Sequence, residues 1–225
     1  LEELKPKGIS VTSDNQKAIK DSEYIILGVQ PQQLKDLLFE VKEAFSPNRH
    51  VIISTVTGVS IAEIEEIIGE GYSIVRATPN TAISIRQSMT SMSSKNTAQE
   101  KVEQVRAIFD VMGKTIVIDE ELMAAATVLG ASGIAFCLRY IRAAAQGGIE
   151  MGFHPEEAQE IAVQTCKGAA SLILEGHNHP EMEIDKVTTP RGCTIAGLNE
   201  MEHNGLSSAL IKGIVASHKK IANIK

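Results

Sequence analysis

Residues 185–202 read DKVTTPRGCTIAGLNEME, and this stretch decides how the C-terminal half of the chain is interpreted. Pro190 fixes its own φ, and Gly192 lets a backbone approach a ligand closely. The apolar run that follows predicts a helix with Thr194 as its N-cap. Free N–H groups, hydroxyls and the positive end of a helix would then meet at one spot, which suits a small carboxylate. An ordinary connection between two helices with a threonine cap fits the same spacing.

The same segment resembles the C-terminal signature of the pyrroline-5-carboxylate reductases, V-[ST]-[ST]-P-G-G-x-T-I-x-[AG]-L followed by an acidic helix. Arg191 stands in place of the first glycine, so it alters the loop geometry or adds a cation near the carboxylate. The resemblance implies that this loop holds the substrate carboxylate and ring nitrogen beside the nicotinamide, with Thr194 as the catalytic contact to the nitrogen. The substrate-binding residues it implies are Val187, Thr188, Thr189, Gly192, Cys193 and Thr194.

Strand-like and helix-like stretches alternate through residues 1–118. Continuous apolar strands that alternate with helices predict a parallel sheet covered by helices. Ser60 and Glu63 have the spacing of a capping box at the start of one of these helices. The predicted strands are 24–29, 51–54, 73–76, 88–93 and 115–118, and the predicted helices include 34–41, 61–67 and 98–112.

Open α/β sheets bind ligands at the carboxyl ends of their strands, which here are residues 28–31, 54–58 and 78–81. Turn residues are needed at any strand end, so one such loop alone indicates little. Residues 76–81, RATPNT, resemble the R-x-x-x-N-T strand end of the same family. The resemblance implies NADP(H) as cofactor, with NAD(H) as the other candidate. It implies that the cofactor-binding residues are Asn15, Val29, Gln30, Pro31, Thr55, Val56, Thr57 and Asn80.

No G-x-G-x-x-G motif occurs in the sequence. A dinucleotide-binding fold normally begins with a strand, a glycine-rich turn and a helix that together hold the pyrophosphate. From the resemblance we therefore expect an N-terminally incomplete Rossmann-type domain that starts after this unit. The missing part would have roughly 35 residues, by analogy with a βαβ unit of that length.

Only helical patterns occur from Glu120 onward, so we expect a dinucleotide-binding domain over 1–118 and an all-helical substrate-binding and dimerisation domain over 119–225. The stretch 131–150 is apolar almost all round, and such a helix must be buried. About 105 residues can hardly surround it alone. We therefore expect a homodimer through the helical domain, and a higher oligomer of dimers is open. The small residues of 130–133, GASG, resemble the family's S-G-S-G helix start, although helix packing explains them equally.

Composition excludes several classes of partner. A net charge of −6 and the absence of Trp argue against nucleic acid. No apolar run reaches the roughly 18 residues of a membrane span, and the N-terminus lacks a signal-peptide pattern. Three cysteines without a CxxC pair favour a cytoplasmic location. His177 and His179 lack a nearby cysteine, so no metal site is expected.

The predicted fold class is α/β, an incomplete Rossmann-type sheet domain followed by an all-α dimerisation domain. The reaction that the resemblance implies is NAD(P)H-dependent reduction of 1-pyrroline-5-carboxylate to L-proline, the last step of proline biosynthesis. Two alternatives remain. Other β-hydroxyacid-type dehydrogenases depend on a lysine in the central helix, and residues 131–150 contain none. A non-catalytic dimeric binding protein would be distinguished by titration with NADPH.

Overall fold

A computed structural model describes residues 2–221 of the chain. Contacts within the chain group residues 1–131 and 218–225 into one unit and residues 132–217 into a second. Residues 119–131 therefore pack with the sheet, although only helices follow residue 118. The domain boundary expected after residue 118 stays a prediction.

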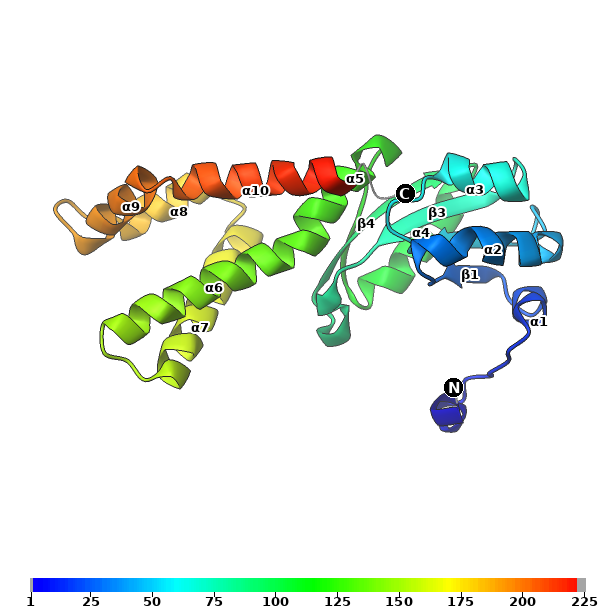
Figure 1. Cartoon of the computed structure of the whole chain (residues 1–225), viewed down its shortest axis with the longest axis horizontal. Coiled ribbons are helices and arrows are strands. Elements are labelled where there is room, and N and C mark those ends of the chain that lie inside the picture. The colour runs from blue at the N-terminus through cyan, green and yellow to red at the C-terminus, as the bar shows by residue number, and fades with distance from the viewer. Residues whose placement is uncertain (1, 222–225) are drawn as a thin grey trace. The chain divides into compact units, whose positions relative to one another are not determined.

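A five-stranded sheet in the order β1-β2-β3-β4-β5 forms the centre of the first unit (Figure 1). All neighbouring strands pair in parallel except β3 and β4, which are antiparallel. The prediction of a parallel sheet is wrong for this pair, because the chain between them holds only the short turn η3 (Thr81–Ile85), and a parallel crossover needs a dozen or more residues. The strands are β1 (Tyr24–Leu27), β2 (Val51–Ser54), β3 (Ser73–Thr78), β4 (Ser88–Lys95) and β5 (Gly113–Val117).

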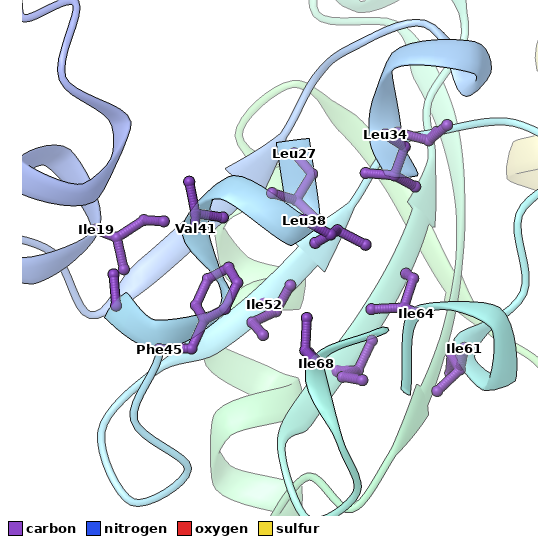
Figure 2. Packing of buried hydrophobic residues seen from close by; sticks show 13 residues of the cluster. Ile19, Leu27, Leu34, Leu38, Val41, Phe45, Ile52, Ile61, Ile64 and Ile68 are labelled. Atoms are coloured by element: carbon purple, nitrogen blue, oxygen red, sulfur yellow. The ribbon is translucent and has the colours of Figure 1, made fainter. Parts of the chain in front are cut away.

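Helices cover both faces of the sheet. Helices α2 (Pro31–Val41) and α3 (Ile61–Ile68) pack against one face, where Figure 2 shows Leu38 and Ile64 together with Ile52 of β2. Helix α4 (Gln99–Asp110) covers the other face, where Val105 packs with the strand residues on either side of Ile52. Because side chains alternate between faces along a strand, continuously apolar strands supply both cores. The predicted strands and their covering helices are therefore confirmed, although Ile26 of β1 and Ile116 of β5 are about half exposed, so these two strands are not buried on both faces.

Short helices complete the first unit. The predicted capping box of α3 is confirmed, since the Ser60 N–H donates to Glu63 Oε2 at 2.8 Å and the Glu63 N–H donates to Ser60 Oγ at 3.2 Å. The remaining helical elements are η1 (Glu2–Lys7), α1 (Asn15–Lys20), η2 (Lys42–Ala44), η4 (Glu120–Leu122), α5 (Met123–Thr127) and the π-helical turn η5 (Val128–Ser132).

Helices alone form the second unit. Helices α6 (Gly133–Glu150) and α7 (Pro155–Gly176) pack through small side chains, and a Cβ added to Gly148 would lie 3.0 Å from the Ala158 Cβ. This close approach explains a glycine at position 148. The other helices are α8 (Pro180–Val187), α9 (Cys193–His203) and α10 (Leu206–Ile221).

Helix α6 buries little of its apolar surface within the chain. Only Ala145 and Gly148 are buried along it, whereas Leu138 and Tyr140 are more than half exposed. The continuous helical stretch Glu120–Glu150 has a mean hydropathy of 1.7 over its most apolar 18-residue window, and 17% of that window is buried. By length and composition this stretch could cross a membrane, although no uninterrupted apolar run of that length exists. A helix whose apolar faces are covered by a partner chain has the same length and hydropathy.

Candidate active site

The carboxyl ends of β1, β2 and β3 lie level with one another. Leu27 pairs with Ser54, and Ser54 pairs with Arg76, so the loops after these strands start at the same edge of the sheet. The Thr55 N–H and hydroxyl both donate to the Leu27 carbonyl, at 3.1 and 3.0 Å. Thr55 therefore joins the first two of these loops, and its hydroxyl proton is used within the protein.

The loop after β1 is open to solvent. A Cβ built on Gly28 meets no atom within 4 Å, and Gln30 is exposed. Pro31 occupies the first turn of α2, where its missing N–H leaves no unpaired donor. Val29 is half-buried against the core, and Val56 after β2 is 4% exposed. These two valines would therefore offer a ligand mainly their backbone, whereas Gly28 and Gln30 lie on accessible surface.

Asn15 does not lie at this edge of the sheet. Its side-chain amide donates to Glu40 Oε1 at 3.2 Å, and Glu40 lies in the last turn of α2. Since α2 begins at the loop after β1, Asn15 lies at the opposite end of that helix, about 15 Å away at 1.5 Å per residue. The structure thus brings Val29, Gln30, Pro31, Thr55, Val56, Thr57 and Asn80 to one edge, and leaves Asn15 apart.

Asn80 follows β3, and each end of its side chain has a hydrogen-bond partner. Its exposed fraction is 8%. The side-chain oxygen accepts from the Ala82 N–H at 3.0 Å, and the side-chain amide donates to the Gly130 carbonyl at 2.9 Å. Its backbone N–H donates to Ser88 Oγ at 3.1 Å. Both ends of the side chain are therefore committed within the first unit.

Glu120 joins three elements of the first unit, which the sequence alone did not indicate. Its Oε1 atom accepts from Arg76 Nη1 at 3.1 Å and from the Ile61 N–H at 2.6 Å. A carboxylate on the first N–H of α3 also meets the positive end of that helix. A cavity of about 160 Å³ adjoins this pair and is lined by Gly58, Ser60, Glu63, Arg76, Glu120, Ala124, Thr127 and Ile221.

The signature loop of the second unit contains a tight turn. The Gly192 N–H donates to the Thr189 carbonyl at 3.0 Å, and Arg191 has a φ of +62°. With Pro190 second and a positive φ third, this is the pattern of a type II turn. A Cβ on Gly192 would lie 2.5 Å from Thr189 Oγ1. A side chain at position 192 would therefore have to displace Thr189, whereas Arg191 holds a conformation that glycine adopts without strain.

Helix α9 begins earlier than predicted. Gly192 is its N-cap, without a side-chain hydrogen bond, and Cys193 is its first residue. The prediction that Thr194 caps the helix is wrong, because the bond from Gly192 back to Thr189 and the extended ψ of 164° at Gly192 place the change of backbone direction at the glycine. With no capping side chain, the first N–H groups of α9 are left for water or an anion.

Side chains around this loop differ in their availability. The Thr188 hydroxyl donates to the Ile184 carbonyl at 2.7 Å, so it can only accept from a ligand. Val187 is 61% exposed at the end of α8, and Cys193 is exposed. Thr194 is half-buried in the first turn of α9. The loop thus combines free N–H groups of a helix start with threonine side chains, a set that suits a small carboxylate.

The two histidines near this loop have roles in the backbone. His177 ends α7 with a φ of +53°, and His179 caps α8 by accepting from the Glu181 N–H at its Nδ1 atom, at 3.3 Å. Hydrogen bonds from Lys186 and then Asn178 hold the pKa of Glu183 below its usual value. The three cysteines, Cys137, Cys166 and Cys193, are free thiols.

Comparison with known protein families matches both parts of the chain. Residues 120–224 match the family model for pyrroline-5-carboxylate reductase dimerisation. Residues 1–58 match the family model for NADP oxidoreductases dependent on coenzyme F420.

Individual similar proteins are also named pyrroline-5-carboxylate reductase. The chain is 50% identical over 236 residues to pyrroline-5-carboxylate reductase 1 of Dictyostelium discoideum, covering all of this chain and 43% of that relative. It is 46% identical to pyrroline-5-carboxylate reductase 2 of the same organism, covering 95% of this chain and 76% of that one. The crystal structure of Plasmodium falciparum pyrroline carboxylate reductase with NADP bound has a TM-score of 0.86 at 24% identity, covering 94% of this chain and 80% of that chain. The chain thus spans less than half of the first relative and about three quarters of the second.

Proposed function

Because the chain belongs to the pyrroline-5-carboxylate reductase family, we propose that it reduces the C=N bond of 1-pyrroline-5-carboxylate to give L-proline with NADPH or NADH. The observation that carries this proposal is the signature loop, in which a type II turn leads directly into the uncapped start of α9. A ligand carboxylate would satisfy the N–H groups that this helix leaves unpaired.

The edge of the sheet suits a nicotinamide cofactor, because open α/β sheets bind nucleotides at the carboxyl ends of their strands. The open space at Gly28 allows a ligand to approach the main chain, and Thr55 holds the neighbouring loop in place. Residues Val29, Gln30, Pro31, Val56 and Thr57 would line the cofactor. A bound NADPH or NADH would supply the hydride, and the family match over residues 1–58 and the NADP bound to the Plasmodium relative favour NADPH.

The substrate would be held by residues 187–194. The N–H groups at the start of α9, including that of Cys193, would bind the carboxylate, and the exposed Thr189 would border it. The Thr194 hydroxyl would hydrogen-bond the ring nitrogen. Protonation of that nitrogen makes the adjacent carbon electrophilic, so the protein contributes orientation and exclusion of water rather than a covalent step.

Substitution of Thr194 tests this function. In Thr194→Ala we expect kcat/KM for pyrroline-5-carboxylate to fall by about 10- to 1000-fold, the range for loss of one orienting or transition-state hydrogen bond. The Kd of NADPH should stay within about twofold, since no cofactor contact is removed. The measurement is the decrease in NADPH absorbance with substrate varied.

Two further variants serve as controls. Thr194→Ser keeps the hydroxyl and should recover most of the activity. Ser208→Ala, on the exposed surface of α10, should change neither constant. Full activity of Thr194→Ala would refute the assignment of Thr194, and binding of NADPH without turnover in the unsubstituted protein would favour the non-catalytic alternative.

We further propose that the protein is a homodimer through its helical part, in the cytoplasm. The match to a dimerisation family supports the first point, as does the apolar surface that α6 leaves uncovered. A partner chain explains this surface better than a membrane, because Arg139 and Arg142 would lie within the apolar stretch. Three free thiols are consistent with a reducing compartment.

A further inference from the structure

The π-helical turn η5 (Val128–Ser132) interrupts a helical stretch that otherwise runs from α5 into α6. Such turns contain one residue more than the α-helix needs, and they occur often at functional sites. They break the regular ladder of main-chain hydrogen bonds, so their carbonyl groups need other donors. The division between the two units of the chain also falls inside this turn, after residue 131.

The buried side chain of Asn80 supplies such a donor. Its amide lies 2.9 Å from the Gly130 carbonyl, in the middle of the turn, while its oxygen holds the Ala82 N–H. Gly130 lies close to β4 as well, since a Cβ built on it would be 3.9 Å from the Met89 carbonyl. One 8% exposed side chain therefore connects the loop after β3 with the turn that precedes α6.

We infer that Asn80 is a positioning residue, whose amide holds the π-helical form of Val128–Ser132. This inference rests on the proposed function only for its consequence in catalysis. The expectation that Asn80 binds the cofactor stays a prediction, and each end of its side chain already has one partner within the protein.

Substitution by aspartate isolates the donor. Asn80→Asp keeps the side-chain size and the oxygen that holds the Ala82 N–H, but it cannot donate to the Gly130 carbonyl. The matched control is Ser88→Ala, which removes the hydroxyl that accepts from the Asn80 backbone and leaves the amide in place. Asn80→Ser, which can still cap η3 but is too short to reach Gly130, provides a second variant if the buried carboxylate prevents folding.

Hydrogen exchange detected by mass spectrometry gives a readout that does not depend on activity. We expect amides of residues 128–137 to exchange at least about tenfold faster in Asn80→Asp and Asn80→Ser, the change produced by about 1.4 kcal/mol. Those of α4 in all variants, and those of residues 128–137 in Ser88→Ala, should be unchanged. Unchanged exchange over residues 128–137 in both Asn80 variants would overturn the inference.

Steady-state kinetics then separate positioning from cofactor binding. We expect kcat to fall by about tenfold in the Asn80 variants while the KM for NADPH stays within about twofold. A rise in that KM with kcat and exchange unchanged would show a direct cofactor contact and refute the positioning role. Absence of turnover in the unsubstituted protein would refute the proposed function, while the exchange experiment would still decide whether Asn80 holds the turn.

Discussion

Arg191 has a left-handed backbone, with a φ of +62°, at the position where the signature has glycine. For a residue with a Cβ this conformation is less favourable by about 1–2 kcal/mol. The turn imposes it, because the Gly192 N–H must reach the Thr189 carbonyl. The chain therefore keeps a cation beside the proposed carboxylate site at the expense of local strain.

Replacement of Arg191 by glycine should stabilise the protein. The gain from relieved strain is reduced by the greater freedom of glycine in the unfolded chain, so we expect the free energy of unfolding to rise by about 0.5–1 kcal/mol. Lys212→Gly, within α10, should lower it by about 1 kcal/mol instead. Urea denaturation measures both, and an equal loss of stability in the two variants would contradict the strain argument.

His50 is a second residue in an unusual environment. It is 2% exposed, and its Nδ1 atom accepts from the Ser46 N–H at 3.0 Å. The ring is therefore neutral with its proton on Nε2, which has no partner in the part of the chain that the structure describes. Burial, followed by the charges of Arg49 and Lys101, lowers the pKa of His50 below its usual 6.5.

Stability should depend on pH through this histidine. Because its pKa is lower in the folded state, the unfolded chain binds more protons once the pH falls below about 6.5, so folding stability decreases from there downward and is fully present above it. We expect the urea midpoint to fall between pH 7.5 and pH 5.5. His50→Gln should flatten this dependence, whereas the exposed His203→Gln should not. The same slope in all three proteins would assign the effect to other groups.

At the scale of elements, Glu120 connects η4 with β3 and with the start of α3. The Arg76 side chain is 10% exposed and that of Glu120 is 32% exposed, so the pair is partly shielded from water. Removal of one partner from such a pair leaves a charge without compensation, which destabilises more than the pair itself stabilises.

Glu120→Ala should lower the free energy of unfolding by about 2–4 kcal/mol, because it leaves Arg76 buried without its partner and the Ile61 N–H without an acceptor. In the double variant Glu120→Ala with Arg76→Met the loss should be smaller than the sum of the two single losses, by about 1 kcal/mol or more. The neighbouring exposed Glu121→Ala should change stability by less than about 0.5 kcal/mol. Strict additivity in the cycle would show that the pair contributes nothing.

At the scale of the whole molecule, the helical unit leaves an apolar surface uncovered. Exposed side chains on its helices include Leu138 at 58%, Ile161 at 51%, Leu172 at 54% and Ile211 at 61%. Large apolar side chains exposed in such number on one helical unit are expected to be covered by a partner chain.

We expect a dimer at micromolar concentration in sedimentation velocity. Leu138→Glu should yield monomeric or insoluble protein, because a charge buried in the interface without a partner is strongly unfavourable. Val111→Glu, at a site of similar exposure after α4, should leave the assembly unchanged. A well-folded monomer of the unsubstituted chain at this concentration would rule out the dimer.

Much of the fold could be predicted locally. Buried strands appear in the sequence as short apolar runs, and Ser60 with Glu63 marks a helix start three residues apart, so both depend on neighbours in the chain. The direction of β4 could not be read in this way. It depends on whether the connection after β3 is long enough to cross the sheet, and the strand itself has the same pattern in either direction.

For the site, the sequence by itself determined the turn, since Pro190 and Gly192 are typical turn residues, and the signature identified the family. The substrate-binding role of the loop residues stays a prediction. Only the tertiary structure decided what several side chains do. Asn80 and Glu120 are engaged with residues 50 and 44 positions away, and Asn15 with one 25 positions away. Hydrogen bonds over such separations form only after the sheet has brought the segments together, so no local pattern encodes them, whereas turns and caps depend on residues a few positions apart.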